Sequence, residues 1–123
     1  MLALSTLEEL ERRLGQELGV SDWHVVTDDD VDTLGFAPRL MDQIVSLSGF
    51  ARIANDGLSR LHFPAPLPVG DRVRLRLSLE AIASHPGGSD VTFLMSFESS
   101  GQSQPVCIAE SVVRVFGAAD TAR

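Results

Sequence analysis

The fold class is decided by residues 72–81, which read Arg72-Val73-Arg74-Leu75-Arg76-Leu77-Ser78-Leu79-Glu80-Ala81. Apolar side chains occupy every second position of this stretch, and polar side chains occupy the positions between them. Because successive side chains of a β-strand point to opposite faces, the alternation predicts a long strand with one face against a core.

The residues on either side extend this strand into a sheet. Apolar residues alternate with mostly polar ones in 91–98, and a further apolar-rich segment covers 106–116. Turn-forming residues at 85–90 and 101–104 separate the three segments, so we expect an antiparallel meander. Residues 50–55 and 58–63 are two more candidate strands, with Gly57 between them. The proline-rich connection at 64–71 cannot be a central strand.

The N-terminal part of the chain carries the helical signals. The capping pattern Ser5-Thr6-Leu7-Glu8 predicts a helix over 6–17, within an N-terminal helical segment of residues 1–20. Trp23–Val26 has the composition of a short strand. Asp28, Asp29 and Asp30 then follow Thr27. We interpret them as the acidic first turn of a helix rather than as metal ligands, because neighbours in a helical turn point in different directions.

Residues 38–48 form the most apolar helical pattern, and Gly49 ends it. The helix is about 11 residues long and apolar around most of its circumference, so we expect it to be buried. It is the only segment apolar enough to cover the sheet. The sequence therefore predicts an α+β architecture, a curved antiparallel sheet around one short buried helix. Residues 117–123 have the composition of a frayed tail.

Length and composition exclude several classes of protein. The 123 residues suit one domain, and the net charge of −7 argues against nucleic-acid binding and against an anionic membrane surface. The sequence has no apolar run of membrane-spanning length and no signal-peptide pattern, so we expect a cytoplasmic protein. Cys107 is the only cysteine, which excludes an intramolecular disulfide and a cysteine metal cluster. We expect no metal and no cofactor.

Several motifs resemble those of a known family. Residues 61–74 read LHFPAPLPVGDRVR and resemble the RFPAPVPVGDRVR block of the MaoC-like hydratases, which include R-specific enoyl-CoA hydratases and hydroxyacyl dehydratases. Residues 105–114 read PVCIAESVVR and resemble that family's closing strand, KPxCVAExVxR. Asn55-Asp56-Gly57 resembles its NYG, and Ser21-Asp22-Trp23 resembles its SDW. The resemblance covers about residues 5–117 and implies that 1–123 is a single MaoC-like domain with a hot-dog fold.

The resemblance is interrupted between residues 34 and 49. Family members carry GDxxxxH there, followed by AHG at the start of the central helix, and the aspartate and histidine handle water at an enoyl or 3-hydroxyacyl thioester. In this chain GDxxxxH has no counterpart, the AHG position reads Ala37-Pro38-Arg39, and no histidine lies between residues 24 and 62. The chain is thus expected to be a shortened member that lacks the catalytic segment. No catalytic residue of the family can be transferred to it.

Two other residues are candidates for a catalytic role. Asp42 lies on the apolar helix with Ser46 one turn later, so it could be a cavity carboxylate that acts as a base or orients a ligand. It could equally pair with Arg39 or bond across a dimer. His62 stands where the family block has arginine, and its alternative is an exposed or interface histidine. The candidate substrate contacts are Arg39, Asp42, Ser46, Asn55 and Gly57.

Some further residues have weaker or divided interpretations. Arg72, Arg74 and Arg76 share one strand face. Together with Arg60 they could meet coenzyme A phosphates or an acidic carrier protein, or form a solvated outer face. His24 and His85 are weaker candidates than His62. Cys107 is expected to be a small core residue.

Three functional hypotheses remain open at this stage. The chain is a non-catalytic partner subunit of another hot-dog protein, or it is a binding or structural protein in which the family pocket has collapsed. Its ligand would be an acyl-CoA, an acyl-carrier-protein thioester or a polyketide-like molecule. The alternative is a divergent enzyme, a hydro-lyase or other lyase or cyclase, that uses non-family residues. A homodimer or heterodimer is expected in each case, because an uncovered sheet edge is a liability.

Overall fold

The computed structural model describes residues 1–33, 35–66 and 69–117 of the chain. Its main feature is a six-stranded sheet in the order β2-β6-β7-β8-β5, with β3 also paired to β6. The four long strands are β5 (Arg52–His62), β6 (Arg72–His85), β7 (Gly88–Ser99) and β8 (Cys107–Phe116). All pairings within this sheet are antiparallel. The predicted meander is therefore confirmed. The turn between β6 and β7 is shorter than the predicted 85–90, because β6 ends at His85 and β7 begins at Gly88.

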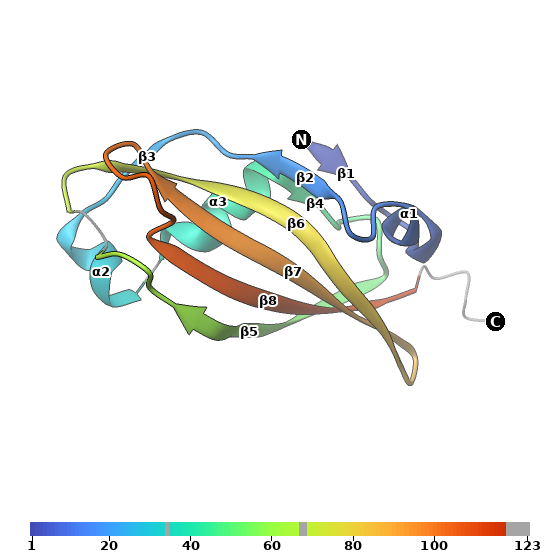
Figure 1. Ribbon diagram of the computed structural model, residues 1–123. Helices are drawn as coiled ribbons and strands as arrows, with labels where there is room; N and C mark the ends of the chain where they lie inside the picture. The colour runs from blue at the N-terminus through green and yellow to red at the C-terminus, as the bar shows by residue number, and fades with distance from the viewer. Residues whose placement is uncertain (34, 67–68, 118–123) are drawn as a thin grey trace.

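The alternation in the sequence corresponds to the two faces of this sheet. On β6 the inward residues Val73, Leu75, Leu77 and Leu79 are all fully buried. On β7 the buried residues likewise alternate with half-buried ones along the whole strand. Figure 1 shows the sheet curving, with α3 (Phe36–Ile44) lying along one face. The predicted α+β architecture is confirmed.

The central helix differs from its prediction in length and in polarity. It spans 36–44 rather than 38–48, because Val45–Ser46 forms β4 and pairs in parallel with β1 (Leu2–Ala3). The expectation of burial around most of the helix was wrong. Phe36, Leu40 and Ile44 are buried, whereas Arg39 and Asp42 are exposed. The helix is amphipathic, so one face covers the sheet and the other is open to a ligand or a partner.

The N-terminal helix was predicted too long. Helix α1 spans Leu7–Arg12 rather than 6–17. The chain turns after the helix, and Glu17–Val20 forms strand β2, which pairs with β6. Its capping box lies one residue later than predicted. The Thr6 hydroxyl accepts the Glu9 N–H at 3.2 Å, and the Glu9 carboxylate accepts the Thr6 N–H at 3.2 Å.

The remaining elements are shorter or more continuous than predicted. Strand β3 covers His24–Val25 and helix α2 covers Asp28–Thr33. The two candidate strands at 50–55 and 58–63 form one strand, β5, with two irregularities in its pairing to β8. Gly57, with φ of 91°, lies in the first irregularity, and Arg60, with φ of 51°, lies in the second. Of the predicted tail at 117–123, residues 118–123 lie outside the described residues.

Candidate functional site

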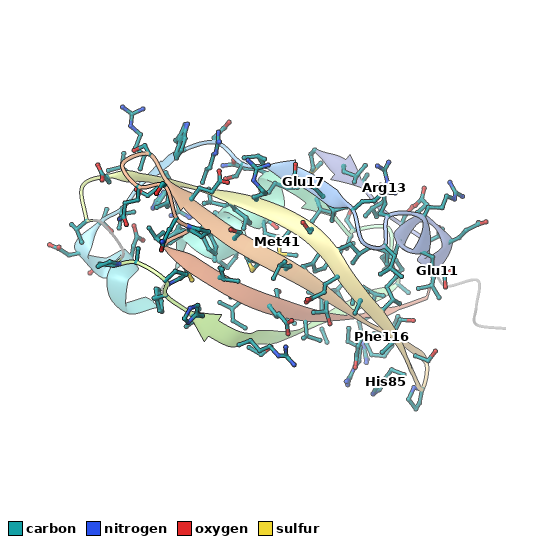
Figure 2. The ribbon with its side chains drawn as sticks, viewed as in Figure 1. Glu11, Arg13, Glu17, Met41, His85 and Phe116 are labelled. Atoms are coloured by element: carbon teal, nitrogen blue, oxygen red, sulfur yellow. The ribbon has the colours of Figure 1, made fainter. Side chains whose placement is uncertain are left out.

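A cavity of about 660 Å³ lies between α3 and the sheet. Its walls come from α3, the β4 segment that follows it, and strands β5, β7 and β8. Most of the lining side chains are apolar. They include Ala37, Pro38, Met41, Val45, Leu47, Ile53, Leu58, Met95 and Val113. Met41, which is labelled in Figure 2, reaches the cavity from α3.

A few polar side chains converge on this apolar space. Asp42 comes from α3, and among the described residues no hydrogen bond or ion pair engages its carboxylate. The Ser46 and Ser48 hydroxyls lie 3.1 Å apart. Asn55 Oδ1 accepts the Gly57 N–H at 2.7 Å. Ser111 is a buried serine on β8 that lines the cavity floor. The cavity thus combines apolar walls with a few polar groups, as small-molecule sites do.

The structure brings four of the five candidate substrate contacts to this cavity. Asp42, Ser46, Asn55 and Gly57 all line it. Arg39 lies on the exposed side of α3, is not among the lining residues, and makes no ion pair with Asp42. His62, the second catalytic candidate, is exposed at the end of β5 beside Ile108 of β8 and also lies outside the lining.

Most of the cavity lining was not predicted from the sequence. Met95 and Val113 were predicted only as parts of the strands at 91–98 and 106–116, and both line the cavity. Ser111 could have been predicted to line a cavity, because it is a polar residue at an inward position of an alternating strand. Such a residue needs a hydrogen-bond partner or access to a cavity.

A second polar cluster, which we call the His24–Asp30 clasp, lies next to α3. His24 Nε2 is 2.8 Å from Asp30 Oδ2, and the same oxygen accepts the Thr27 N–H at 2.8 Å. The His24 ring stacks on Phe36 at 5.0 Å between ring centroids. The clasp joins β3, α2 and α3, and neither His24 nor Asp30 lines the cavity. It therefore positions the start of α3 rather than contacting a ligand there.

The clasp accounts for the third of the consecutive aspartates, and all three lie in the first turn of α2. Asp30 caps the start of α2 through the Thr27 N–H, as the sequence predicted for this acidic turn. Within 1–33, 35–66 and 69–117, no three histidine, cysteine or acidic side chains come together to hold a metal ion.

The clasp is expected to make stability depend on pH. Burial raises the pKa of Asp30, but the hydrogen bonds from the Thr27 N–H and His24 outweigh burial and lower it below the ordinary value. A carboxyl with a lowered folded pKa stabilises the protein above the unfolded pKa of about 4, and this stabilisation disappears as the pH falls through the folded pKa.

We expect Asp30→Asn to reduce the free energy of unfolding by roughly 1–3 kcal/mol at neutral pH, since His24 and the Thr27 N–H lose a charged partner. The difference from the wild type should shrink at about pH 3. Urea unfolding at both pH values measures this. Asp28→Asn, at an exposed position of the same helix, is the control. An equal loss at both pH values would contradict the interpretation.

In the arginine row on β6, Arg74 and Arg76 are paired with acidic side chains on the outer face of the sheet. Glu98 lies 2.9 Å from Arg74 Nε and 3.0 Å from Arg76 Nε, and Glu17 lies 2.7 Å from Arg76 Nη1. The hydrogen bond from Arg76 is the main cause that lowers the pKa of Glu98, against the opposing effect of burial. Arg74 also stacks over Trp23. These contacts favour the outer-face interpretation over a phosphate site, because a phosphate would have to compete with Glu98.

Two other residues of the sequence analysis lie outside any site. Cys107 is fully buried, and burial raises the pKa of its thiol to about 11, as suits a core residue. His85 lies beside the β6–β7 turn, where its Nδ1 is 3.1 Å from the Pro86 carbonyl oxygen.

Comparison with curated proteins identifies a relative across almost the whole chain. The 3-hydroxyacyl-thioester dehydratase Z of Mycobacterium tuberculosis is 28% identical over 148 residues, covering 93% of this chain and 98% of the relative. The protein of the same name from Mycobacterium bovis matches equally well. The match spans 148 residues and this chain has 123, so part of the relative has no counterpart here. No protein-family model matches the chain.

Solved structures establish the fold. The MaoC-like dehydratase of Rhodospirillum rubrum has a TM-score of 0.62 at 20% identity, covering 91% of this chain and 97% of its own. A monoamine oxidase regulatory protein from Archaeoglobus fulgius has a TM-score of 0.64 at 10% identity, covering 95% and 99%. A hot-dog-like protein from Thermanaerovibrio acidaminovorans has a TM-score of 0.54 at 16% identity, covering 85% and 87%. The predicted hot-dog fold is confirmed. None of the described helices could cross a membrane.

Proposed function

We propose that this chain, which is a MaoC-like hot-dog protein, binds an acyl-thioester or polyketide-like ligand in the α3 cavity without the family's hydratase mechanism. One observation carries the proposal: the cavity measures about 660 Å³, its walls are mostly apolar, and its described lining contains no histidine. An apolar space of this size suits an acyl chain. A cavity of this volume supports a ligand-binding role over a structural role with a collapsed pocket.

The sheet edge supports a role in an assembly. Strand β5 pairs with β8 on one side, and on the described part of the chain nothing covers its other side. Ile53, Leu58, Leu61 and Phe63 are exposed along or just after this strand, and the first two also line the cavity. A second chain that paired with β5 would shield these side chains and narrow the cavity mouth. It would be another copy or a hot-dog subunit that retains an aspartate and a histidine, and the mass of the native complex distinguishes the two.

A divergent enzyme is the second candidate. Asp42 favours it, because a carboxylate without a partner among the described residues faces an apolar cavity. Such a group can act as a general base or orient a reacting group. This alternative predicts hydration or dehydration of a thioester that depends on Asp42.

We expect short- and medium-chain acyl-CoA esters to stabilise the protein, by about 2.7 kcal/mol at a ligand concentration of 100 times the dissociation constant. Replacing Ser111 by leucine places a larger side chain on the cavity floor and should weaken binding at least about tenfold. Thermal shift and calorimetric titration measure both effects.

Ser78→Leu is the matched control, because Ser78 lies on the outer face of β6 and away from the cavity lining. It should bind as the wild type does. If no acyl-CoA ester stabilises the wild type, the ligand-binding proposal fails. If Ser111→Leu binds as tightly as Ser78→Leu, the ligand does not occupy this cavity.

A further inference from the structure

The charge inside the α3 cavity is of one sign. Asp42 supplies the only charged side chain among the described residues that line it. The other polar groups of the lining are the hydroxyls of Ser46, Ser48 and Ser111 and the amide of Asn55. Met1 also lines the cavity and is 80% exposed, and Asp42 is exposed as well, so both lie at the open rim of the cavity.

The cations of the protein lie elsewhere. No arginine occurs among the described lining residues, and the sequence has no lysine. Arg74 and Arg76 are held by Glu98, and Arg114 lies 2.7 Å from Asp90. Arg52 stacks over Phe116 at 4.2 Å. Arg39 is on α3 but outside the lining. A ligand anion beside Asp42 would therefore meet a carboxylate, with no arginine among the described lining residues to compensate it.

Among the hydrogen-bonding groups of the cavity, the Asp42 carboxylate favours a donor on the ligand. The Asp42 carboxylate only accepts hydrogen bonds when ionised, and within the described structure it receives none. The Ser46 and Ser48 hydroxyls are close enough to bond each other, and Asn55 Oδ1 is occupied by the Gly57 N–H. Asp42 is thus the strongest free acceptor on the described walls, and it adjoins apolar side chains such as Met41 and Val45.

We infer that the part of the ligand inside the cavity is apolar and carries an uncharged or cationic hydrogen-bond donor, a hydroxyl or an amine, which meets Asp42. Ligands with a carboxylate or phosphate at this position are rejected. The inference rests on the proposed function, in that it assumes that this cavity is the binding site, and it narrows the substrate class. A negative charge near Asp42 is repelled, and the apolar walls offer it little solvation.

A matched series of small ligands tests the inference. Hexanol, hexylamine and hexanoate share one apolar chain and differ in the head group, and hexanoyl-CoA tests the thioester in parallel. We expect calorimetric titration to show hexanol and hexylamine binding at least about tenfold more tightly than hexanoate. Asp42→Asn should abolish this preference. Glu11→Gln removes the same charge from an exposed position of α1, labelled in Figure 2, and should retain it.

The outcomes separate this inference from the proposed function. Raising the salt concentration should weaken hexylamine binding and leave hexanol binding unchanged, which distinguishes a cationic from a neutral donor. Equal binding of all three head groups, or a preference that persists in Asp42→Asn, overturns the inference even if hexanoyl-CoA binds. If the protein discriminates among the three small ligands but does not bind hexanoyl-CoA, the inference about Asp42 is supported and the thioester is excluded as the ligand. If none of the four ligands binds, both proposals fail.

Discussion

We expect a Phe36→Ala variant to lose roughly 3–5 kcal/mol of unfolding free energy, the usual cost of truncating a buried aromatic residue. Phe36 is fully buried at the start of α3. It stacks on His24 and meets Phe97 of β7 edge to face, with ring centroids 5.4 Å apart. The truncation therefore leaves a void between the clasp, the helix and the sheet. Urea unfolding followed by the fluorescence of Trp23, the only tryptophan, measures the loss.

The matched control is Phe63→Ala, because Phe63 is 44% exposed and its truncation creates no internal void. We expect a change within about 1 kcal/mol for this variant. The two variants should also differ in ligand binding, since Phe36 adjoins Gly35 and Ala37 of the cavity lining. A Phe36→Ala variant as stable as Phe63→Ala would mean that the His24, Phe36 and Phe97 contacts do not hold the helix in place.

The purified protein is expected not to hydrate crotonyl-CoA or longer enoyl-CoA esters at a measurable rate. A positioned acid or base contributes on the order of 10² to 10⁴ to such a reaction. The described cavity lining has no histidine to serve as one, and the partly buried His24–Asp30 clasp lies outside it. Loss of enoyl-thioester absorbance over time measures the rate, with an active enoyl-CoA hydratase as positive control.

The same assay on the Asp42→Ala variant distinguishes the ligand-binding protein from the divergent enzyme. If the wild type turns over any enoyl or 3-hydroxyacyl thioester and Asp42→Ala does not, the divergent-enzyme alternative replaces the proposed function. If turnover survives in Asp42→Ala and disappears in His24→Gln, the clasp takes part in the chemistry and its purely positioning role is wrong. Thioester binding without turnover in all three proteins supports the proposed function.

The sheet could be predicted from the sequence because its signal is local. Over residues 73–79 of β6 and 91–97 of β7 each inward residue is apolar and its neighbours are mostly polar, so the alternation alone assigns the faces. The local periodicity gave wrong element bounds where a segment pairs with a strand that is distant in the sequence. Glu17 to Val20 continue a helical pattern, but their backbone pairs with β6, and Val45 leaves α3 to pair with Leu2. Pairings between distant segments leave no periodic signal in either one.

The cavity was only partly predictable for a related reason. Asp42 and Ser46 stood out because polar residues on an apolar helix need partners. The amphipathic character of α3 was missed because the helix was predicted over 38–48. With the observed bounds, Phe36, Leu40 and Ile44 follow one another at four-residue spacing on one face. The His24–Asp30 contact joins residues of two elements across a turn, so neither helical nor strand spacing predicts it. Gly57 and Arg60 lie in the irregular pairings that keep β5 continuous, where the sequence indicated two strands.

The short parallel pair of β1 and β4 has a practical consequence. It fastens the first residues of the chain beside the end of α3, and Met1 itself lines the cavity. An affinity tag fused ahead of Met1 would therefore start at the mouth through which a ligand must pass, and it could obstruct binding or imitate a bound molecule. Titrations with untagged protein, or with a tag placed after Arg123, avoid this artefact.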